Sequence, residues 1–452
     1  MIHCPTTFIS PRKRSWGMAL FSLILVACPV FSQQQDSLTI NKAIEIVLKR
    51  HPSIVQATEA LAAMQERTQG QKSSYLPFAN ISVADVYLGP EYPFNLGVAK
   101  FPMYPDNNFD AHFGAEYTVF DFGKRRISVE SAKTGEESAG DRLQSIRTNL
   151  YYQVSQIFTT IILLEKSILV SDDAIAELDR HLLTVKKKVE TGSATEFDVL
   201  KTEVQRAVAQ SQRIDIGADL VKKQTVLRQL LGMPENAPLF LHGGFDTLFV
   251  NQKADTLIQN ALQNRSDYAM AIHTKKSAEL QRQSAKIVNL PQLGVHASLG
   301  YKNGLPNDAP PPSTDISTPR FNWSAGAQIS MPLYDGMRAH HLETEADRNV
   351  KAASAAVNDI EEKIKSDVLQ AQTDVEASYA KLDVSRKQVQ FSQRSLELAQ
   401  LKYDAGVITN LDVLDAENDF SQAQLGHLQN QYRYVMSMYA LEQATGKSQD
   451  AQ

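Results

Sequence analysis

Apolar residues recur along this chain with two different periods, which predict helices and strands. A period of three to four residues runs through about 38–73 and 252–288, as expected for α-helices. The same period continues through two longer segments of about 65–70 residues, one after each pair of predicted strands. A period of two residues, typical of β-strands, occupies four shorter segments, about 79–88, 109–121, 292–302 and 320–334. At about 1.5 Å per residue the longest helices would reach roughly 100 Å, which no compact domain can contain.

The same order of elements occurs twice, at a constant offset of 214 residues. The identical pairs include Ile44 and Ile258, Leu48 and Leu262, Pro77 and Pro291, Asp121 and Asp335, Gly192 and Gly406, Thr195 and Thr409, Asp198 and Asp412, Val199 and Val413, Leu200 and Leu414, Glu203 and Glu417, and Gly232 and Gly446. Such an offset indicates a tandem duplication. We therefore divide the chain into a first repeat, 33–232, a connecting segment, 233–251, a second repeat, 252–446, and a short tail, 447–452.

Residues 1–32 have the pattern of a secretory signal peptide. Three basic residues, 12–14, precede an apolar run that is too short to span a bilayer, and Val30-Phe31-Ser32 favours cleavage after Ser32. An alternative is the lipobox-like sequence 25–28, in which Cys28 would become the lipidated first residue. The other cysteine, Cys4, also lies in this segment, so a product cut after Ser32 would have no thiol.

Composition and charge exclude several classes of protein. The chain is 43% hydrophobic and 21% charged with a formal net charge of −5, which argues against a polytopic helical membrane protein and against a nucleic-acid binder. No phosphate loop, nucleophile elbow or metal-ligand spacing is present. His340 and His341 stand near Glu343 and Glu345, but adjacent helical residues point about 100° apart. We therefore predict no catalytic residue, cofactor or metal site.

The four strands have the length and the aromatic residues of membrane-spanning β-strands. Each alternates apolar and polar residues over about 11–13 positions, enough to cross a bilayer when tilted. The residues expected to face lipid include Phe109, Phe113, Tyr117, Tyr301 and Trp323. The segments between paired strands, 88–108 and 302–320, hold nine of the 18 prolines and are expected to be exposed loops. A soluble β-sandwich is the alternative, and Asp85 on the apolar face is unexplained.

Four strands, predicted as two hairpins, are too few to close a barrel. Unpaired strand edges are not tolerated in lipid, so several chains must contribute strands. A dimer would give eight strands, whose interior side chains fill, whereas a trimer would give 12 and leave a pore.

The segment Tyr403-Asp404-Ala405-Gly406-Val407-Ile408-Thr409-Asn410-Leu411-Asp412-Val413-Leu414-Asp415, with the duplicated plan, resembles the outer membrane efflux protein (TolC) family over about 36–446. The resemblance implies a mainly α fold in which each repeat is a β-hairpin with long coiled-coil-like helices. It implies a homotrimer whose 12-stranded outer-membrane barrel continues into a periplasmic α-helical barrel. The implied function is the exit duct of a tripartite efflux or type I secretion system, a passive channel rather than an enzyme.

The implied partners are outer-membrane lipid, a periplasmic adaptor (membrane fusion) protein and an inner-membrane pump of RND or ABC type. From the residues alone, two other classes stay open. A periplasmic coiled-coil adaptor would explain the long helices and the signal peptide but not the strands. A secreted enzyme or binding protein would explain the signal peptide, although no site can be named for it.

The far ends of the long helices carry the candidate functional residues. Gly192 and Gly406 suit helix C-terminal turns, and Thr195 with Asp198 and Thr409 with Asp412 suit capping boxes. In a trimer, three copies of Asp412 and Asp415 would instead form carboxylate rings that attract cations. For Asp415, an ion pair with Lys201 is the alternative.

The resemblance assigns roles to these residues. It implies that Asp412 and Asp415 line the periplasmic entrance, and that Asp198 and Tyr403 join across helices to hold it shut. Ile408 departs from the best-known member, which has an arginine there that helps to latch the closed state. We expect Asp198→Ala or Tyr403→Phe to raise conductance. Val407, Ile408 and Leu411 are candidates for adaptor contact, with burial between helices as the alternative.

Overall fold

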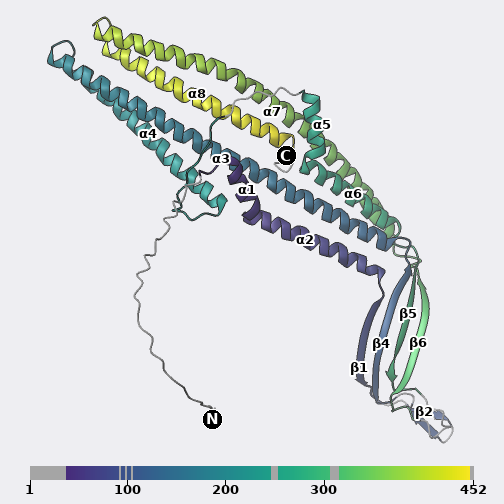
Figure 1. Ribbon diagram of the computed structural model, residues 1–452. Helices are drawn as coiled ribbons and strands as arrows, with labels where there is room; N and C mark the ends of the chain where they lie inside the picture. Colours follow the sequence, from purple (N-terminus) through teal and green to yellow (C-terminus); the bar gives the residue numbers. More distant parts are fainter. Residues whose placement is uncertain are drawn as a thin grey trace, which may run out of the picture.

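Helices and strands follow one another in the same order in the two halves of the chain (Figure 1). The first half contains α1 (Ile40–Arg50), α2 (Pro52–Lys72), the 3-10 turn η1 (Ser73–Tyr75), β1 (Phe78–Tyr87), β4 (Asn107–Phe120), α3 (Lys124–Glu190) and α4 (Glu196–Leu231). The second half contains α5 (Ala254–Asn264), α6 (Ser266–Lys286), β5 (Gln292–Lys302), β6 (Arg320–Ser330), α7 (Arg338–Asp404) and α8 (Asn410–Ala444). The offset of 214 relates both ends of α1, α2 and α3 to those of α5, α6 and α7.

This computed structural model describes residues 37–447, apart from 91–92, 97–98, 103–104, 246–252 and 306–314. The predicted signal peptide, with its cleavage site after Ser32 and the possible lipidation site Cys28, lies outside the described residues. The predicted tail lies outside them from residue 448 onward.

Each helical stretch predicted before a strand is in fact two helices. The break falls at His51 in the first half and at Arg265 in the second, where ψ is 133° and 118° instead of helical. Pro52 explains the first break, because proline disfavours the helical conformation of the residue before it. The second break has no proline; there, polar contacts of Arg265 hold the junction.

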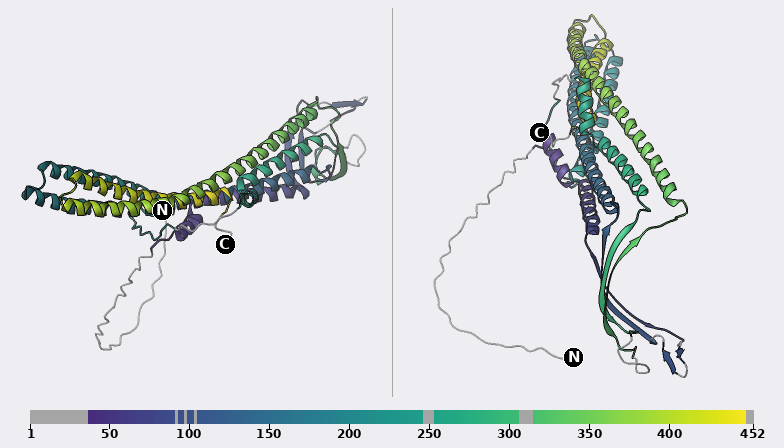
Figure 2. Two further views of the ribbon diagram at one scale, coloured as in Figure 1. Left: turned by 90° about the horizontal axis from the view of Figure 1, so that it is seen from above. Right: turned by 90° about the vertical axis from the view of Figure 1, so that its right-hand side faces the viewer.

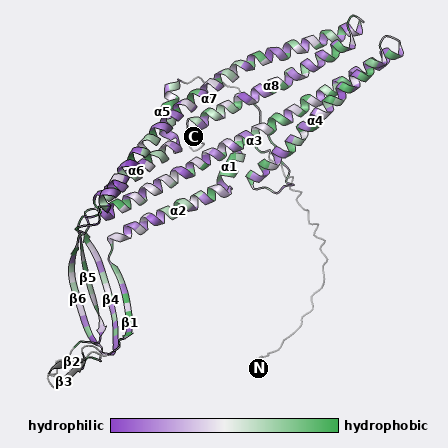
Figure 3. Cartoon of the chain, turned by 180° about the vertical axis from the view of Figure 1, so that it is seen from behind, coloured by the Kyte–Doolittle hydropathy of each residue, from purple (hydrophilic) through white to green (hydrophobic). Residues whose placement is uncertain are grey.

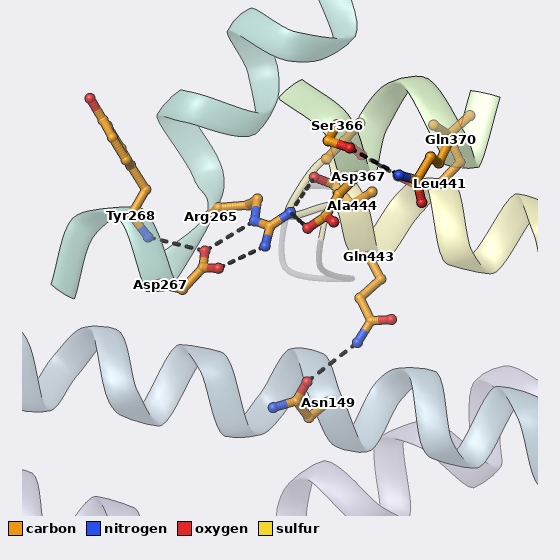
Figure 4. Close-up of polar contacts among 11 residues, drawn as sticks. Asn149, Arg265, Asp267, Tyr268, Ser366, Asp367, Gln370, Leu441, Gln443 and Ala444 are labelled. Carbon is orange, nitrogen blue, oxygen red and sulfur yellow. Dashed lines mark hydrogen bonds and ion pairs between the residues drawn. The ribbon is translucent and has the colours of Figure 1, made fainter. Parts of the chain in front are cut away.

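The contacts of Arg265 join this break to the end of α8 (Figure 4). Its guanidinium donates to both carboxylate oxygens of Asp267, at 3.0 and 2.7 Å, and to Asp367 on α7 at 3.0 Å. It also donates to the backbone oxygen of Ala444 at 3.4 Å. The junction between α5 and α6 is therefore tied to α7 and to the C-terminal end of α8.

Four strands form one sheet in the order β1-β4-β5-β6, with every neighbouring pair antiparallel. The two predicted hairpins are thus joined, because β4 also pairs with β5. The strand predicted to reach 334 ends at Ser330, just before Pro332, which has no N–H to donate. Inside the predicted loop 88–108, β2 (Pro93–Leu96) and β3 (Ala99–Pro102) form a small two-stranded sheet that the sequence pattern did not indicate.

The helices form a long bundle with the sheet at one end (Figures 1 and 2). The two longest helices, α3 and α7, each contain 67 residues and run from the sheet to the opposite end. There the chain reverses, and α4 packs along α3 while α8 packs along α7. Nearer the sheet, α2 packs along α3 and α6 packs along α7. Each long helix therefore has one shorter helix beside its half near the sheet and another beside its far half.

The largest hydrophobic core lies in the middle of the bundle, where α1, α3 and α4 meet. Its fully buried side chains include Val47, Val154, Ile161 and Leu227. The described part of the connecting segment packs on it, and Leu38 accepts from His242 at 3.1 Å and donates to Phe240 at 2.8 Å through backbone groups. Among the described helices, α3 alone contains a stretch apolar enough to cross a membrane. The core residues of α3, including Val154 and Ile161, account for much of its apolar character.

Candidate functional site at the helical tip

Two tight turns close the end of the bundle that lies farthest from the sheet. We call these turns, 191–195 and 405–409, with the helix ends beside them, the tip. In the first turn, Gly192 has φ +74° and donates to Val189 at 2.9 Å, while Ser193 donates to Lys188 at 2.7 Å. In the second turn, Gly406 has the same φ and the same two hydrogen bonds recur. Glycine is favoured at both positions because a positive φ strains other residues.

A capping box begins each returning helix. The Oδ2 atom of Asp198 accepts from the backbone N–H of Thr195 at 2.9 Å and from its hydroxyl at 2.8 Å. The Oδ2 atom of Asp412 accepts from the same groups of Thr409 at 2.8 and 2.7 Å. The hydrogen bonds from Thr409 hold the pKa of Asp412 below its usual value, so this carboxylate is ionised near neutral pH.

Tyr403 is buried at the tip between α3 and the start of α8. Its ring lies beside Val185 and Val413, with the ring of His181 at 5.3 Å between centroids. Lys188 donates to the backbone oxygen of Tyr403, and its ammonium lies 4.0 Å from the centre of the ring. Burial, helped by the Asp198 carboxylate, raises the pKa of the phenol, which is therefore neutral.

Asp198 and Tyr403, which the resemblance expects to join across helices, form no hydrogen bond with each other in the described chain. Among the residues that the structure describes, the Tyr403 hydroxyl has no hydrogen-bond partner. The Asp198 carboxylate instead caps its own helix through Thr195. The two residues lie at the same tip, but the structure does not connect them directly.

The helical part contains two helical hairpins, one formed by α3 and α4 and the other by α7 and α8. A contact that the sequence did not predict joins these two hairpins. Asn410, the first residue of α8, is buried and donates through Nδ2 to the backbone oxygen of Asp198 at 3.1 Å and to the Thr202 hydroxyl at 3.3 Å. Its Oδ1 therefore accepts from Nε2 of His181 on α3, at 2.7 Å. The one available signal was a departure from the repeat, because the position that matches Asn410 is the exposed Glu196.

The remaining tip residues divide into exposed and packed groups. Asp415 is exposed, and the ion pair with Lys201 is not among the contacts of the described chain; Lys201 lies over the Phe197 ring at 5.5 Å. Val407 and Leu411 are 70% and 58% exposed. Ile408, by contrast, packs against the Tyr403 cluster, so it belongs to the tip core rather than to its surface.

Phe197 and Leu200 on α4 are also exposed apolar residues of the tip, although the hydrophobic pattern of the sequence did not single them out. Phe197 occupies the position that matches Leu411 in the second repeat, so the repeat itself was the signal. The exposed apolar surface of the tip therefore comes from both hairpins.

At the other end of the molecule, the sheet has one apolar and one polar face. Residues paired directly across strands share a face, and one such row is Ile81, Phe113, Leu299 and Trp323. The five aromatic residues predicted to face lipid all lie on this face. The opposite face carries polar or small residues, and one row on it is Asn80, Gly114, Ser298 and Ser324. Hydrophobic and hydrophilic residues therefore both occur along the strands (Figure 3).

The register also places Asp85, which the sequence pattern left unexplained. It pairs with Phe109 on the apolar face, two residues before β1 ends at Tyr87. That end of the sheet is remote from the helices (Figure 1), where a strand is expected to leave lipid for water.

The sequence pattern of the outer membrane efflux proteins matches two segments of the chain, 43–233 and 257–447. The chain belongs to the outer membrane efflux protein family. The resemblance and the duplicated fold inferred from the sequence are confirmed, because the family pattern occurs once in each repeat.

Individual proteins of the family resemble the chain over most of its length. Outer membrane efflux protein BepC of Brucella suis is 22% identical over 329 residues, which are 73% of this chain and 70% of BepC. Outer membrane protein TolC of Vibrio cholerae is 21% identical over 71% of this chain and 73% of TolC. The crystal structure of VceC from Vibrio cholerae superposes with a TM-score of 0.76 at 19% identity, covering 90% of this chain and 96% of VceC.

Membership in this family establishes the location and the general function. The protein is an outer-membrane efflux channel with a helical extension in the periplasm. The family is one of passive channels rather than enzymes. The adaptor and secreted-enzyme alternatives are therefore set aside.

Proposed function

We propose that three copies of this chain form a passive exit duct whose periplasmic end is gated at the tip. The four-stranded sheet, with one apolar face and two open edges, carries this proposal. In the described chain β1 and β6 each have one neighbouring strand, so their outer backbone groups need partners in lipid. Pairing β6 of one copy with β1 of the next supplies them. Three copies give a 12-stranded barrel with the apolar face toward lipid and room for a lumen.

Exposed apolar stripes on two helices support lateral association of the helical part. On α4 the stripe contains Phe197, Leu200 and Val204. On α7 the stripe contains Val384, Phe391 and Leu398, each seven residues after the last, and Leu401 three residues further on, as in a coiled-coil seam. Neighbouring copies that bury these stripes would continue the helical bundle into a closed α-helical barrel below the membrane.

The gate in this proposal is the tip. Asp412 and Asp415, repeated three times, would line the entrance with carboxylates and favour cations there. Within each copy, the two hairpins are held together by Asn410 with His181 and by Lys188 with the backbone of Tyr403. Asp198 serves this contact through its backbone oxygen rather than its carboxylate.

Docking of the periplasmic adaptor would open this gate. The exposed tip residues Val407, Leu411, Phe197 and Leu200 offer an apolar surface for adaptor helices. An inner-membrane pump of RND or ABC type would then deliver the exported substrate to the entrance. The duct itself needs no cofactor for this role.

Crosslinking in isolated outer membranes tests the assembly. A mature chain cut after Ser32 has no cysteine of its own. We would introduce Ser82→Cys on β1 and Asn322→Cys on β6, the two edge strands, and treat the membranes with a short thiol crosslinker. A crosslink between these cysteines then reports that two copies are in contact. We expect a crosslinked trimer. Glu116→Cys with His296→Cys, which face each other within one sheet, should crosslink without raising the mass. A largest species of two chains, or none, would refute the trimer.

A further inference from the structure

A partly enclosed cavity of about 270 Å³ lies between the two helical hairpins, next to the tip. All four long helices line it. The residues that matter here are Glu177 and Arg180 of α3, Val208 of α4, Leu396 of α7, and Glu417 and Phe420 of α8. Its wall is part apolar and part carboxylate, a combination that the passive duct does not require.

Glu417 is the unusual member of this wall. It is 7% exposed, and neither of its carboxyl oxygens has a hydrogen-bond partner in the described part of the chain. Buried ionisable groups are normally paired, since an unpaired charge loses its hydration without compensation. Burial, with a smaller contribution from the Glu177 carboxylate, raises the pKa of Glu417 to about 8.

The repeat shows which partner is missing. Glu203 matches Glu417 in the first repeat and pairs with Lys186 at 3.1 Å. The position that matches Lys186 is Gln400, a neutral residue whose amide donates to Glu177 at 2.8 Å instead. The second repeat has therefore lost the cation that its glutamate would pair with.

The other charged residues around the cavity do not replace that cation. Arg180 pairs with Glu177, and its side chain is 70% exposed. Its positive charge lowers the pKa of Glu417, but burial outweighs this effect and the pKa stays raised. The remaining charged lining residue is Asp173 on α3, a further carboxylate, whereas the lining residues of α4 and α7 are uncharged. The cavity is therefore net negative.

We propose that this cavity binds a small organic ammonium ion, with the positive charge beside Glu417 and the apolar part against Leu396, Val208 and Phe420. A metal ion is disfavoured, because no group of three metal-ligating side chains occurs among the described residues. An aromatic ring and a carboxylate on apolar walls are the features that recognise organic ammonium groups. The volume suits a compact ligand at the small end of the usual range for binding pockets.

Titration calorimetry with benzyltrimethylammonium tests this site on the full-length protein in a non-ionic detergent. We expect saturable binding of one ion per chain at pH 9. At pH 7 Glu417 must release a proton before it pairs with the ion, so the affinity should fall about tenfold. The measured heat should then vary with the ionisation enthalpy of the buffer, as release of a proton requires.

Matched variants separate the charge of Glu417 from a general effect. Glu417→Gln should abolish binding, while Glu203→Gln, at the matching exposed position, should leave it unchanged. Equal binding of the neutral benzyl alcohol, an affinity independent of pH, or unchanged binding to Glu417→Gln would each overturn the proposal. Should Glu417→Gln fail to assemble, the buffer dependence of the unsubstituted protein decides the question.

Discussion

Asn410 on α8 accepts a 2.7 Å hydrogen bond from His181 on α3, and this bond links the two helical hairpins at the tip. The same amide group donates to Asp198 and Thr202 on α4. One buried side chain therefore joins three helices at the proposed gate.

Replacing Asn410 with alanine should loosen the tip. The change leaves the buried His181 imidazole without its partner, which costs the closed arrangement about 1–3 kcal/mol. The Thr202 hydroxyl keeps its own hydrogen bond to the backbone oxygen of Asp198, at 2.9 Å. Single-channel recording in planar bilayers should show higher conductance or more frequent opening. Glu196→Ala, at the matching exposed position of the first repeat, is the control and should behave as the parent. Identical conductance of the parent and Asn410→Ala would show that this contact does not hold the gate.

Tyr403→Phe should leave conductance nearly unchanged, contrary to the latch that the family resemblance implied. The hydroxyl that it removes has no hydrogen-bond partner in the described chain, whereas the ring keeps its packing. Tyr403→Ala should instead destabilise the tip by about 3–5 kcal/mol, because it removes a buried ring. A marked rise in conductance for Tyr403→Phe would restore the hydroxyl as a latch.

Glu417→Gln should stabilise the protein at neutral and alkaline pH. The folded-state pKa of about 8 lies above the ordinary value of 4.5, so the folded form binds the proton more tightly than the unfolded form. Glu417 therefore does not change the free energy of unfolding of the parent below about pH 4.5. As the pH rises from 4.5 toward 8, the raised pKa lowers that free energy, by about 3 kcal/mol at pH 7. Thermal unfolding should show nearly equal melting temperatures for Glu417→Gln and the parent near pH 5. As the pH is raised, Glu417→Gln should melt at an increasingly higher temperature than the parent. Parallel curves would place Glu417 in a solvated environment.

Arg265→Ala should weaken the middle of the bundle. The substitution removes ion pairs to Asp267 and Asp367 from a guanidinium that is mostly buried, at a cost of about 2–3 kcal/mol. Denaturant unfolding followed by helical circular dichroism should show the loss. The control is Arg282→Ala, whose 3.5 Å ion pair with Asp347 is exposed and worth at most about 1 kcal/mol. Equal losses for the two variants would contradict the role given to Arg265.

Much of the fold could be predicted from local patterns in the sequence. The offset between pairs such as Gly192 and Gly406 fixed the duplicated plan, and the alternation around Phe113 and Trp323 fixed which residues share a face of the sheet. The capping boxes at Thr195 and Thr409 were predictable because their partners lie three residues away. The break at Arg265 was not, because it has no proline and depends on contacts with α7 and α8.

The sequence by itself determined the repeat, the helix and strand periods, and the turns, because each depends on neighbours along the chain. Only the tertiary structure decided what meets across helices. It brought His181 to Asn410 and, among the described residues, left the Tyr403 hydroxyl and the buried Glu417 carboxyl without hydrogen-bond partners. The physical reason is that hydrogen bonding and ionisation of buried groups depend on atoms within a few ångströms, which here come from residues more than 200 positions apart.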